Sequence, residues 1–425
     1  MYLRGAGESV PRLDCPDDPN ALNIPSIACA KYYAANFGTQ GMSYFTITQA
    51  SHDLAFLIDE LGNEPNYIQG NSFGTFWGQR YLSMYPQQVA GGVIESFDVP
   101  DRWNYFEAFN NIDWVGKRVL MYCSEDTFCN ANAGNGRDPT AVMEDLLWRA
   151  DEGTLPCIAK LPAQTMAPDG DWRMALETLF GSLTGAAREP YAFVPPLVRR
   201  LVRCDDDDVN AIIHLWKQQF GGSSMRNPQP LVGPKPGKMN GRDSCTLSQV
   251  VLYNLFLSEG VQSPPPPSVT DMRAAFRLQL FTGPFSVMEH ARGLYDAWPR
   301  YPLDKWAHHY PNTSIPILFF NGDLDISTPW ANAAYSSLTY TRQGHRLLRL
   351  PQVPHVGLLT SPVQGSPVPC GLDMATQFLA SGGTLVNTTC INFLLPLDWM
   401  ATSATAKAFS LSLFGTDDPW GQGSN

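Results

Sequence analysis

The 425-residue chain is 44% hydrophobic and 12% aromatic, enough for a large core, so intrinsic disorder is not expected. Its net charge of −11 leaves no basic face for phosphate groups, which disfavours binding to nucleic acid or to anionic membranes. The sequence contains neither a run of about 18 apolar residues nor a Cys/His metal pattern, so no membrane span, metal or cofactor is expected.

The first recognisable elements alternate between helix and strand. Residues 46–62 place leucines at helical spacing and stop at a glycine, whereas residues 66–69 have the composition of a short strand. A second amphipathic helix is predicted over 75–85, closed by Pro86, and a second strand over 91–97. This order predicts a parallel sheet whose strands are joined by crossover helices.

The pattern changes over residues 103–309. Helical segments there are separated by loops rich in glycine and proline, which include Asn227–Pro230 and the proline run 264–267. The strand–helix alternation of a parallel sheet is absent, so we interpret the stretch as an inserted, mostly helical cap with prolines as stiff linkers.

The sheet pattern then resumes. Ile315–Phe320 is a buried-strand run, Thr328 and Pro329 cap and start a helix, and residues 346–350 form another strand. Both ends of the chain therefore belong to one sheet. The predicted division is a first core part over 1–102, a cap over 103–309 and a second core part over 310–425.

A glycine-bounded motif, Gly70-Asn-Ser-Phe-Gly74, lies between the first predicted strand and the helix that follows it. It matches the GxSxG nucleophile elbow, in which a serine stands on a strained turn and the glycines let strand and helix approach closely. Attack on an acyl carbon also needs backbone donors for the oxyanion. We therefore predict Ser72 as the nucleophile and the Phe73 N–H as one oxyanion donor.

A general base is sought among only seven histidines. His345 begins the strand 346–350 and would point along it. His355 follows that strand in the loop 351–357, from which an imidazole can swing to the nucleophile. We predict His355 as the base, and its alternative role is that of a surface loop histidine.

The acid is expected after the preceding strand, because the elbow belongs to a fold that orders its triad as Ser, Asp, His along the chain. Asn321–Asp325 offers two aspartates with the same strand parity, Asp323 and Asp325. The local pattern does not separate them. An aspartate beside a glycine often only holds a turn, which is the alternative role for Asp323.

Nine cysteines, several at short spacings beside polar loop residues, suggest an oxidising compartment, and the alternative is buried reduced cysteine. The close pairs are Cys15 with Cys29, Cys123 with Cys129, and Cys370 with Cys390. Cys157, Cys204 and Cys245 remain unassigned. At least one thiol must therefore be free or paired elsewhere.

Two further features bear on location. Asn312 and Asn387 begin glycosylation sequons, which agree with a secretory route. The segment Met1–Gly5 has no apolar signal-peptide core. We expect a secreted protein whose signal peptide is not present in this chain.

Three further features are the elbow with Gln79–Tyr81 and Met84–Pro86, the segment Gly322–Pro329, and the block Cys370–Cys390 with Gln377–Gly383. Together these segments resemble the tripeptidyl-aminopeptidase branch of the prolyl-aminopeptidase-like serine peptidases. The resemblance covers nearly the whole chain and implies an α/β-hydrolase fold, secretion, and bridges Cys15–Cys29 and Cys370–Cys390. In that family's GDxDxxTP pattern the second aspartate is catalytic, which selects Asp325.

The N-terminal segment both resembles and departs from the same family. Arg4–Ser9, with Pro11–Cys15 after it, is similar to the family's RGxGxS turn, which there follows the first strands and a His-Gly-Gly-type oxyanion loop. Here the turn begins at residue 4, no such loop occurs, and Tyr2 replaces the family's aspartate before the turn. We expect the first strands and half of the oxyanion hole to be missing, and therefore poor turnover.

The leading functional hypothesis is an exopeptidase that releases short or proline-containing units from peptide N-termini. An acidic cap residue would receive the substrate amine, and Glu259 is a speculative candidate whose alternative role is a solvated helix end. Trp103, Trp114 and Trp148 could line the cleft, although core packing is the alternative for each. Two other hypotheses stay open, a carboxylesterase or lipase of the same fold and a non-catalytic remnant.

Overall fold

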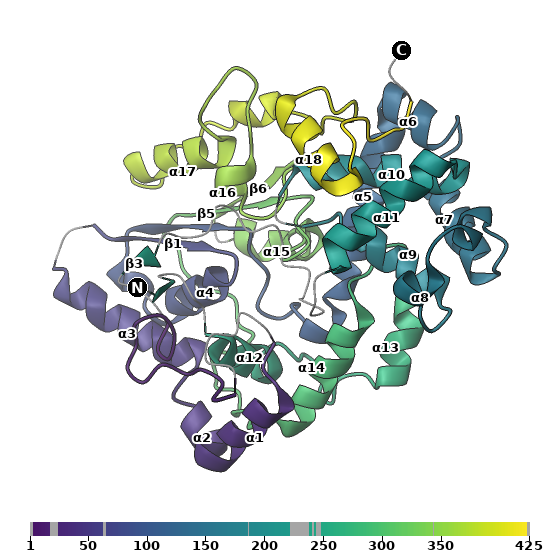
Figure 1. Ribbon diagram of the computed structural model, residues 1–425. Helices are drawn as coiled ribbons and strands as arrows, with labels where there is room; N and C mark the ends of the chain where they lie inside the picture. The colour runs from purple at the N-terminus through teal and green to yellow at the C-terminus, as the bar shows by residue number, and fades with distance from the viewer. Residues whose placement is uncertain are drawn as a thin grey trace.

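A four-stranded parallel sheet forms the centre of the molecule (Figure 1). The computed structural model describes residues 3–17, 24–62, 65–185, 187–221, 238–239, 242–243, 248–342 and 344–422. The strands are β1 (Tyr67–Asn71), β2 (Gly91–Glu95), β5 (Ile317–Gly322) and β6 (Arg346–Leu350), in the spatial order β1-β2-β5-β6. All neighbours in this sheet are parallel, which confirms the expected sheet built from both ends of the chain. Within the described ranges, no helix has the length and apolar character needed to cross a membrane.

Helices cover both faces of the sheet. They are α3 (Ile47–Glu60), α4 (Gly74–Met84), α15 (Trp330–Arg342), α16 (Gly357–Thr360) and α17 (Cys370–Ala380). Phe319 of β5 stacks on Tyr340 of α15 with ring centroids 4.1 Å apart, whereas Phe320 belongs to a second buried cluster with Met374 of α17. Successive side chains of a strand point to opposite faces, so α15 and α17 lie on opposite sides of the sheet.

The chain between β2 and β5 is mainly helical, consistent with the predicted cap. Its helices are α5 (Phe109–Glu125), α6 (Thr127–Ala133), α7 (Pro139–Asp151), α8 (Ala163–Met166), α9 (Trp172–Gly181), α10 (Val194–Arg203), α11 (Asp206–Phe220), α12 (Gln249–Ser258), α13 (Val269–Phe276) and α14 (Phe285–Ala297). Two short antiparallel strands, β3 (Lys238–Met239) and β4 (Arg242–Asp243), also fall in this stretch.

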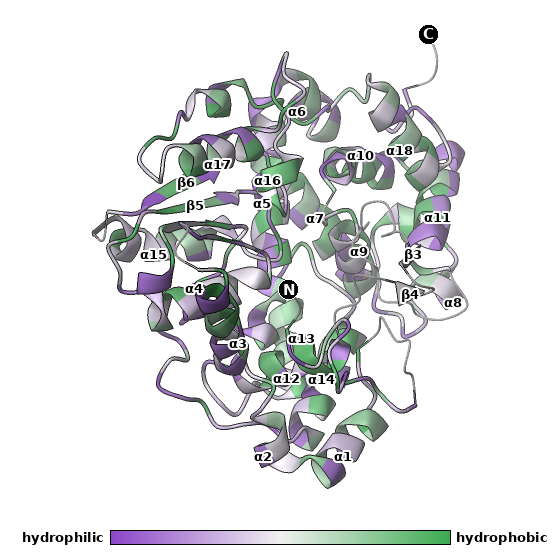
Figure 2. Cartoon of the chain, turned by 90° about the vertical axis from the view of Figure 1, so that its left-hand side faces the viewer, coloured by the Kyte–Doolittle hydropathy of each residue, from purple (hydrophilic) through white to green (hydrophobic). Residues whose placement is uncertain are grey.

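The helical insertion is divided between two hydrophobic cores. Helices α5, α7, α9, α10 and α11 share one core with α18 (Ala404–Phe414) near the C-terminus. Helices α12, α13 and α14 share the other with α1 (Ile27–Asn36) and α2 (Gly38–Met42), and these five helices lie together at one end of the molecule (Figures 1 and 2). Each core therefore joins residues of the insertion to residues outside 103–309.

The predicted strand over 91–97 is two residues too long. β2 ends at Glu95, because Ser96 adopts a left-handed backbone conformation with φ 48° that takes the chain out of the sheet. β1, in contrast, continues past the predicted end at residue 69 to Asn71. Both differences fall at the carboxyl ends of the strands, where the candidate site lies.

Disulfides join four pairs of cysteines in the described part of the chain. The three pairs close in sequence are bonded, Cys15–Cys29, Cys123–Cys129 and Cys370–Cys390, and a fourth bridge joins Cys157 to Cys204. The sequence had left both of the latter unassigned, and Cys245 lies outside the described residues. Several disulfides suggest an extracellular protein. Both sequon asparagines, Asn312 and Asn387, are exposed.

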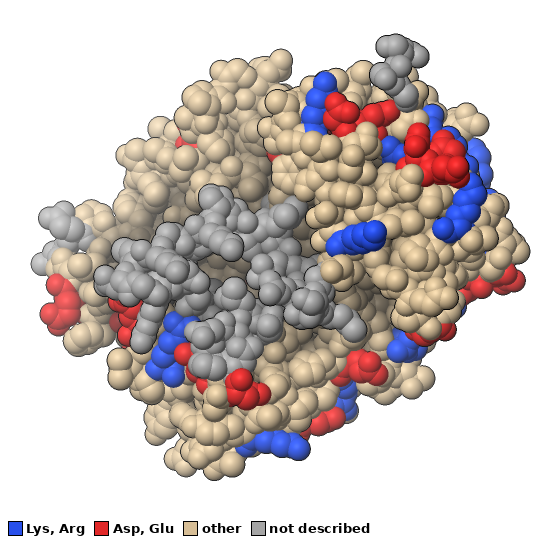
Figure 3. All heavy atoms as spheres, viewed as in Figure 1, with Lys and Arg blue, Asp and Glu red and all other residues tan. Residues whose placement is uncertain are grey.

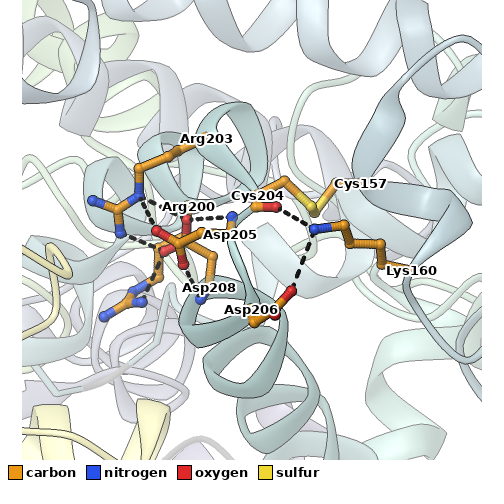
Figure 4. Close-up of a disulfide and its surroundings, with 8 residues drawn as sticks. All are labelled: Cys157, Lys160, Arg200, Arg203, Cys204, Asp205, Asp206 and Asp208. Atoms are coloured by element: carbon orange, nitrogen blue, oxygen red, sulfur yellow. Dashed lines mark hydrogen bonds and ion pairs between the residues drawn. A yellow bond between two sulfur atoms is a disulfide. The ribbon is translucent and has the colours of Figure 1, made fainter.

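The Cys157–Cys204 bridge lies beside a network of ion pairs (Figure 4). Lys160 donates to the Cys204 carbonyl at 3.0 Å and pairs with Asp206 at 3.4 Å. Next to it, the fully buried Asp208 accepts from Arg200 at 2.9 Å and from Arg203 at 2.6 Å. On the face shown in Figure 3, Lys and Arg side chains occur beside Asp and Glu at the upper right of the view.

The two bridges within the insertion should differ in their contribution to stability. Cys157–Cys204 closes a loop with a sequence separation of 47 residues, and Cys123–Cys129 closes one of 6. Chain-entropy estimates give about 4 kcal/mol for the longer loop and about 2 kcal/mol for the shorter. We expect Cys157→Ser/Cys204→Ser to lower the free energy of unfolding in urea about twice as much as Cys123→Ser/Cys129→Ser. Equal losses would contradict an origin in loop closure.

Candidate active site

Ser72 stands on a sharp turn between β1 and α4. Its backbone φ is 52°, in the left-handed region that a non-glycine residue rarely adopts, so the turn is strained as a nucleophile elbow requires. A Cβ on Gly70 would lie 2.8 Å from the Gly74 carbonyl oxygen, which explains why glycine is needed there. Gly74 itself has open space, and its lack of a side chain is not required by a close contact.

Ser72, His355 and Asp325 form one hydrogen-bonded line. His355 Nε2 lies 2.7 Å from Ser72 Oγ, and His355 Nδ1 lies 2.9 Å and 2.8 Å from the two carboxylate oxygens of Asp325. The three side chains come from the ends of β1, β6 and β5, which meet at one edge of the parallel sheet. The structure thus brings together the three residues that the sequence predicts as a triad.

The Asp325 carboxylate is buried and held on its other side. One oxygen accepts the N–H groups of Ser327 and Thr328, each at 2.9 Å, and the other accepts the Thr328 hydroxyl at 2.7 Å. Burial lowers the pKa of His355, but the charge and hydrogen bond of Asp325 raise it above its ordinary value. The carboxylate therefore favours the protonated imidazole.

Asp323 makes different contacts. Its carboxylate accepts hydrogen bonds from Tyr122, Arg349 and the Gln352 N–H, the last at 2.8 Å, and none of these partners is His355. These bonds join the end of β5 to α5, to β6 and to the start of the loop after β6. None of these partners lies in the turn that contains Asp323, so the carboxylate connects separate elements of the fold.

The two histidines considered as base lie in different surroundings. His345 is buried next to Phe319 and Tyr340, and burial lowers its pKa to about 4. Only His355 contacts the serine among the described histidines.

Phe73 begins the helix that follows the nucleophile, at the N-cap position of α4. Backbone N–H groups at a helix start have no partner within the helix, so this end of α4 suits a developing negative charge. The predicted role of the Phe73 N–H as an oxyanion donor stays a proposal.

A cavity of about 670 Å³ opens on Ser72 and His355. Its described lining contains no Asp, Glu, Lys or Arg, and it is formed mostly by apolar side chains. These include Phe73, Phe76, Trp103, Phe109, Phe256 and Ile326. The cavity therefore suits an uncharged, largely apolar group beside the serine.

Glu259 lies in a separate, smaller cavity of about 30 Å³, which shares part of the same aromatic wall. Its carboxylate pairs with Arg80 at 2.5 Å and accepts the Tyr301 hydroxyl at 2.7 Å. It is not among the residues that line the larger cavity. The structure thus does not bring Glu259 to Ser72.

The three tryptophans considered for the cleft have different environments. Trp103 lines both cavities. Trp114 and Trp148 are 47% and 57% exposed and line neither cavity, so core packing is the wrong description for these two.

Two buried acids near the triad were not singled out in the sequence. Glu95 ends β2, Asp98 follows it, and neither is exposed to solvent. Burial raises the pKa of each carboxyl to about 7, and His355 and Asp325 both act on Glu95. The available signal was an acidic residue at the end of an otherwise apolar strand.

The comparison with protein families agrees with this fold. Residues 3–131 match the family described as the alpha/beta hydrolase fold. No curated protein matches the sequence. Among solved structures, epoxide hydrolase VrEH1 from Vigna radiata is 15% identical, with a TM-score of 0.26 over 84% of this chain and 76% of that one. A laboratory-evolved variant of potato epoxide hydrolase StEH1 is 14% identical, with a TM-score of 0.26 over 75% and 73%.

The chain thus has an α/β-hydrolase fold, with a parallel sheet and many helices. The family match suggests a hydrolase. Similarity to the two epoxide hydrolases is too low to carry an argument about substrate.

Proposed function

We propose that this chain is a serine hydrolase that forms an acyl-enzyme on Ser72. The observation that carries the proposal is the line from Ser72 Oγ through His355 to the buried Asp325 carboxylate, with the serine held in a strained turn. This combination supplies a nucleophile, a base within hydrogen-bond distance, and a group that orients the base.

In the proposed reaction, His355 Nε2 takes the Ser72 hydroxyl proton as Oγ attacks the acyl carbon. Asp325 holds the proton of Nδ1 and stabilises the imidazolium. The oxyanion lies near the Phe73 N–H at the start of α4. His355 then gives its proton to the leaving group. In the second half of the reaction, His355 takes a proton from a water molecule that attacks the acyl carbon, and returns a proton to Ser72 Oγ as the acyl–oxygen bond breaks.

For the substrate, we propose short peptides cleaved from the N-terminus. Support comes from the resemblance of the elbow, the Gly322–Pro329 segment and the Cys370–Cys390 block to tripeptidyl-aminopeptidases. Secretion is part of the same proposal, and the disulfides are compatible with it. An acceptor for the substrate ammonium is still required, and Glu259 would have to leave Arg80 to provide it.

A carboxylesterase or lipase is the second candidate. The observation that favours it is the cavity beside Ser72, whose described lining has no carboxylate to receive an ammonium group. An uncharged acyl chain buries apolar surface there without leaving a charge unpaired. The remaining alternative, a non-catalytic remnant, requires that a fluorophosphonate probe leaves Ser72 unlabelled.

The two substrate classes differ in whether a free amino group on the substrate contributes to binding. If the chain is an exopeptidase, N-acetylation of a chromogenic tripeptide should remove most turnover, because the ammonium charge would no longer contribute to binding. The measurement compares kcat/KM for the free and acetylated peptides with that for short p-nitrophenyl esters. Equal rates for both peptides, together with faster ester hydrolysis, would instead establish the esterase.

A further inference from the structure

The end of strand β2 holds the loop that carries His355. The Val356 N–H donates to Ser96 Oγ at 2.8 Å, and the Gly357 N–H donates to the same oxygen at 3.3 Å. The Leu358 N–H donates to Glu95 Oε2 at 3.4 Å. Three consecutive backbone donors after His355 are therefore bound by two consecutive side chains of one strand end.

Backbone geometry on both sides of this contact is unusual. Ser96 and Val356 have φ values of 48° and 60°, both in the left-handed region. Such conformations persist only where surrounding contacts fix them. The hydrogen bonds from residues 356–358 to Ser96 and Glu95 are contacts of this kind, and they fix the position of the imidazole directly before them.

Glu95 also acts on His355 through its charge. The carboxyl is fully buried, and burial raises its pKa to about 7, while Ser96, His355 and the Leu358 N–H favour its ionised form and Asp325 opposes it. For His355, burial lowers the pKa, and Asp325 followed by Glu95 raises it. His355 thus binds one carboxyl group, that of Asp325 at the end of β5, and feels the charge of a second, that of Glu95 at the end of β2. Asp98 is the other buried acid nearby, and its pKa is raised by burial first and by the charge of Asp325 as a smaller cause.

We propose that Glu95 and Ser96 are positioning residues for His355, with Ser96 fixing the loop and Glu95 stabilising the imidazolium in addition to Asp325. The inference rests on the proposed role of His355 as the base. An imidazolium forms during serine attack, so the ionised form of a second buried carboxyl group near it lowers the free energy of that state.

The charge effect is tested by NMR titration of the full chain with labelled histidine, in which His355→Ala assigns the resonance. Glu95→Gln keeps an acceptor for the Leu358 N–H and removes the charge. We expect the pKa of His355 to fall by about half a unit or more, because an opposite charge close by favours the protonated ring.

Glu177→Gln is the matched control. That carboxyl is equally buried, its pKa is raised to about 8, and it pairs with Arg173 rather than with the triad. An unchanged His355 titration in Glu95→Gln would overturn the electrostatic role.

The positioning effect is tested by the rate at which a fluorophosphonate labels Ser72 as a function of pH. In Glu95→Gln the acidic limb of the pH–rate profile should move to lower pH, since His355 loses its proton more readily. Ser96→Ala should lower the labelling rate of folded protein about tenfold without moving the limb. A Ser96→Ala protein that is less stable but labelled at the wild-type rate would show a purely structural role. Absence of label on wild-type Ser72 would reject the proposed function, whereas normal labelling with an unshifted limb in Glu95→Gln would reject this inference alone.

Discussion

Replacing Ser72 by alanine should abolish covalent labelling by a fluorophosphonate and reduce kcat by a factor on the order of 10⁶. Loss of the nucleophile or the base in a serine hydrolase with a triad typically has an effect of this size, because the residues act as one unit. His355→Ala should cost nearly as much, since its Nε2 lies 2.7 Å from Ser72 Oγ and an unassisted hydroxyl is a poor nucleophile at neutral pH. Mass spectrometry of the labelled protein and steady-state kinetics measure the two effects.

His345→Ala is the matched control for the base. This histidine is buried beside Phe319 and Tyr340 in the sheet core, so its removal should lower the melting temperature through lost packing. The labelling rate of the folded fraction should stay close to that of the wild type. If His345→Ala lost labelling while His355→Ala kept it, the base would be misassigned. Label that persisted on Ser72→Ala would place the nucleophile elsewhere.

The sequence predicted those parts of the site whose catalytic residues lie beside recognisable strands and turns. The strand–turn–helix context around Gly70–Gly74 was readable because glycine spacing and hydrophobic periodicity are both local signals. His355 followed from its place after the last strand. The disulfide between Cys157 and Cys204 was not readable, because 47 residues separate the two cysteines and only tertiary packing brings them together.

The parts that sequence did not reveal depend on contacts between distant segments. Glu95 and Ser96 looked like the end of a strand, and their contact with residues 356–358 spans about 260 positions. Glu259 looked available to bind an amine, but Arg80, 179 residues away, neutralises it. In both cases the role of a charged side chain is decided by its partner, and local sequence carries no information about that partner.

Asp325→Asn should reduce kcat by about 10⁴-fold while leaving the fold intact. The asparagine amide would donate to His355 Nδ1, which stabilises the tautomer with a proton on Nε2, and that tautomer does not accept the Ser72 proton. The variant should still fold, because the asparagine oxygen remains able to accept the Ser327 and Thr328 N–H groups that the carboxylate now binds at 2.9 Å.

Asp323→Asn is the matched control, since it makes the same substitution two residues earlier in the same segment. Its carboxylate binds Tyr122, Arg349 and the Gln352 N–H, so the loss of charge should lower the free energy of unfolding by about 1–3 kcal/mol. Turnover of the folded protein should fall less than tenfold, because His355 keeps its partner. The two variants are compared by kcat and by urea unfolding in parallel. The expected pattern is reciprocal, with a large kinetic and small stability effect for Asp325 and the opposite for Asp323. Equal kinetic losses would mean that the carboxylate of Asp325 has no special relation to the base, whatever the distance between them.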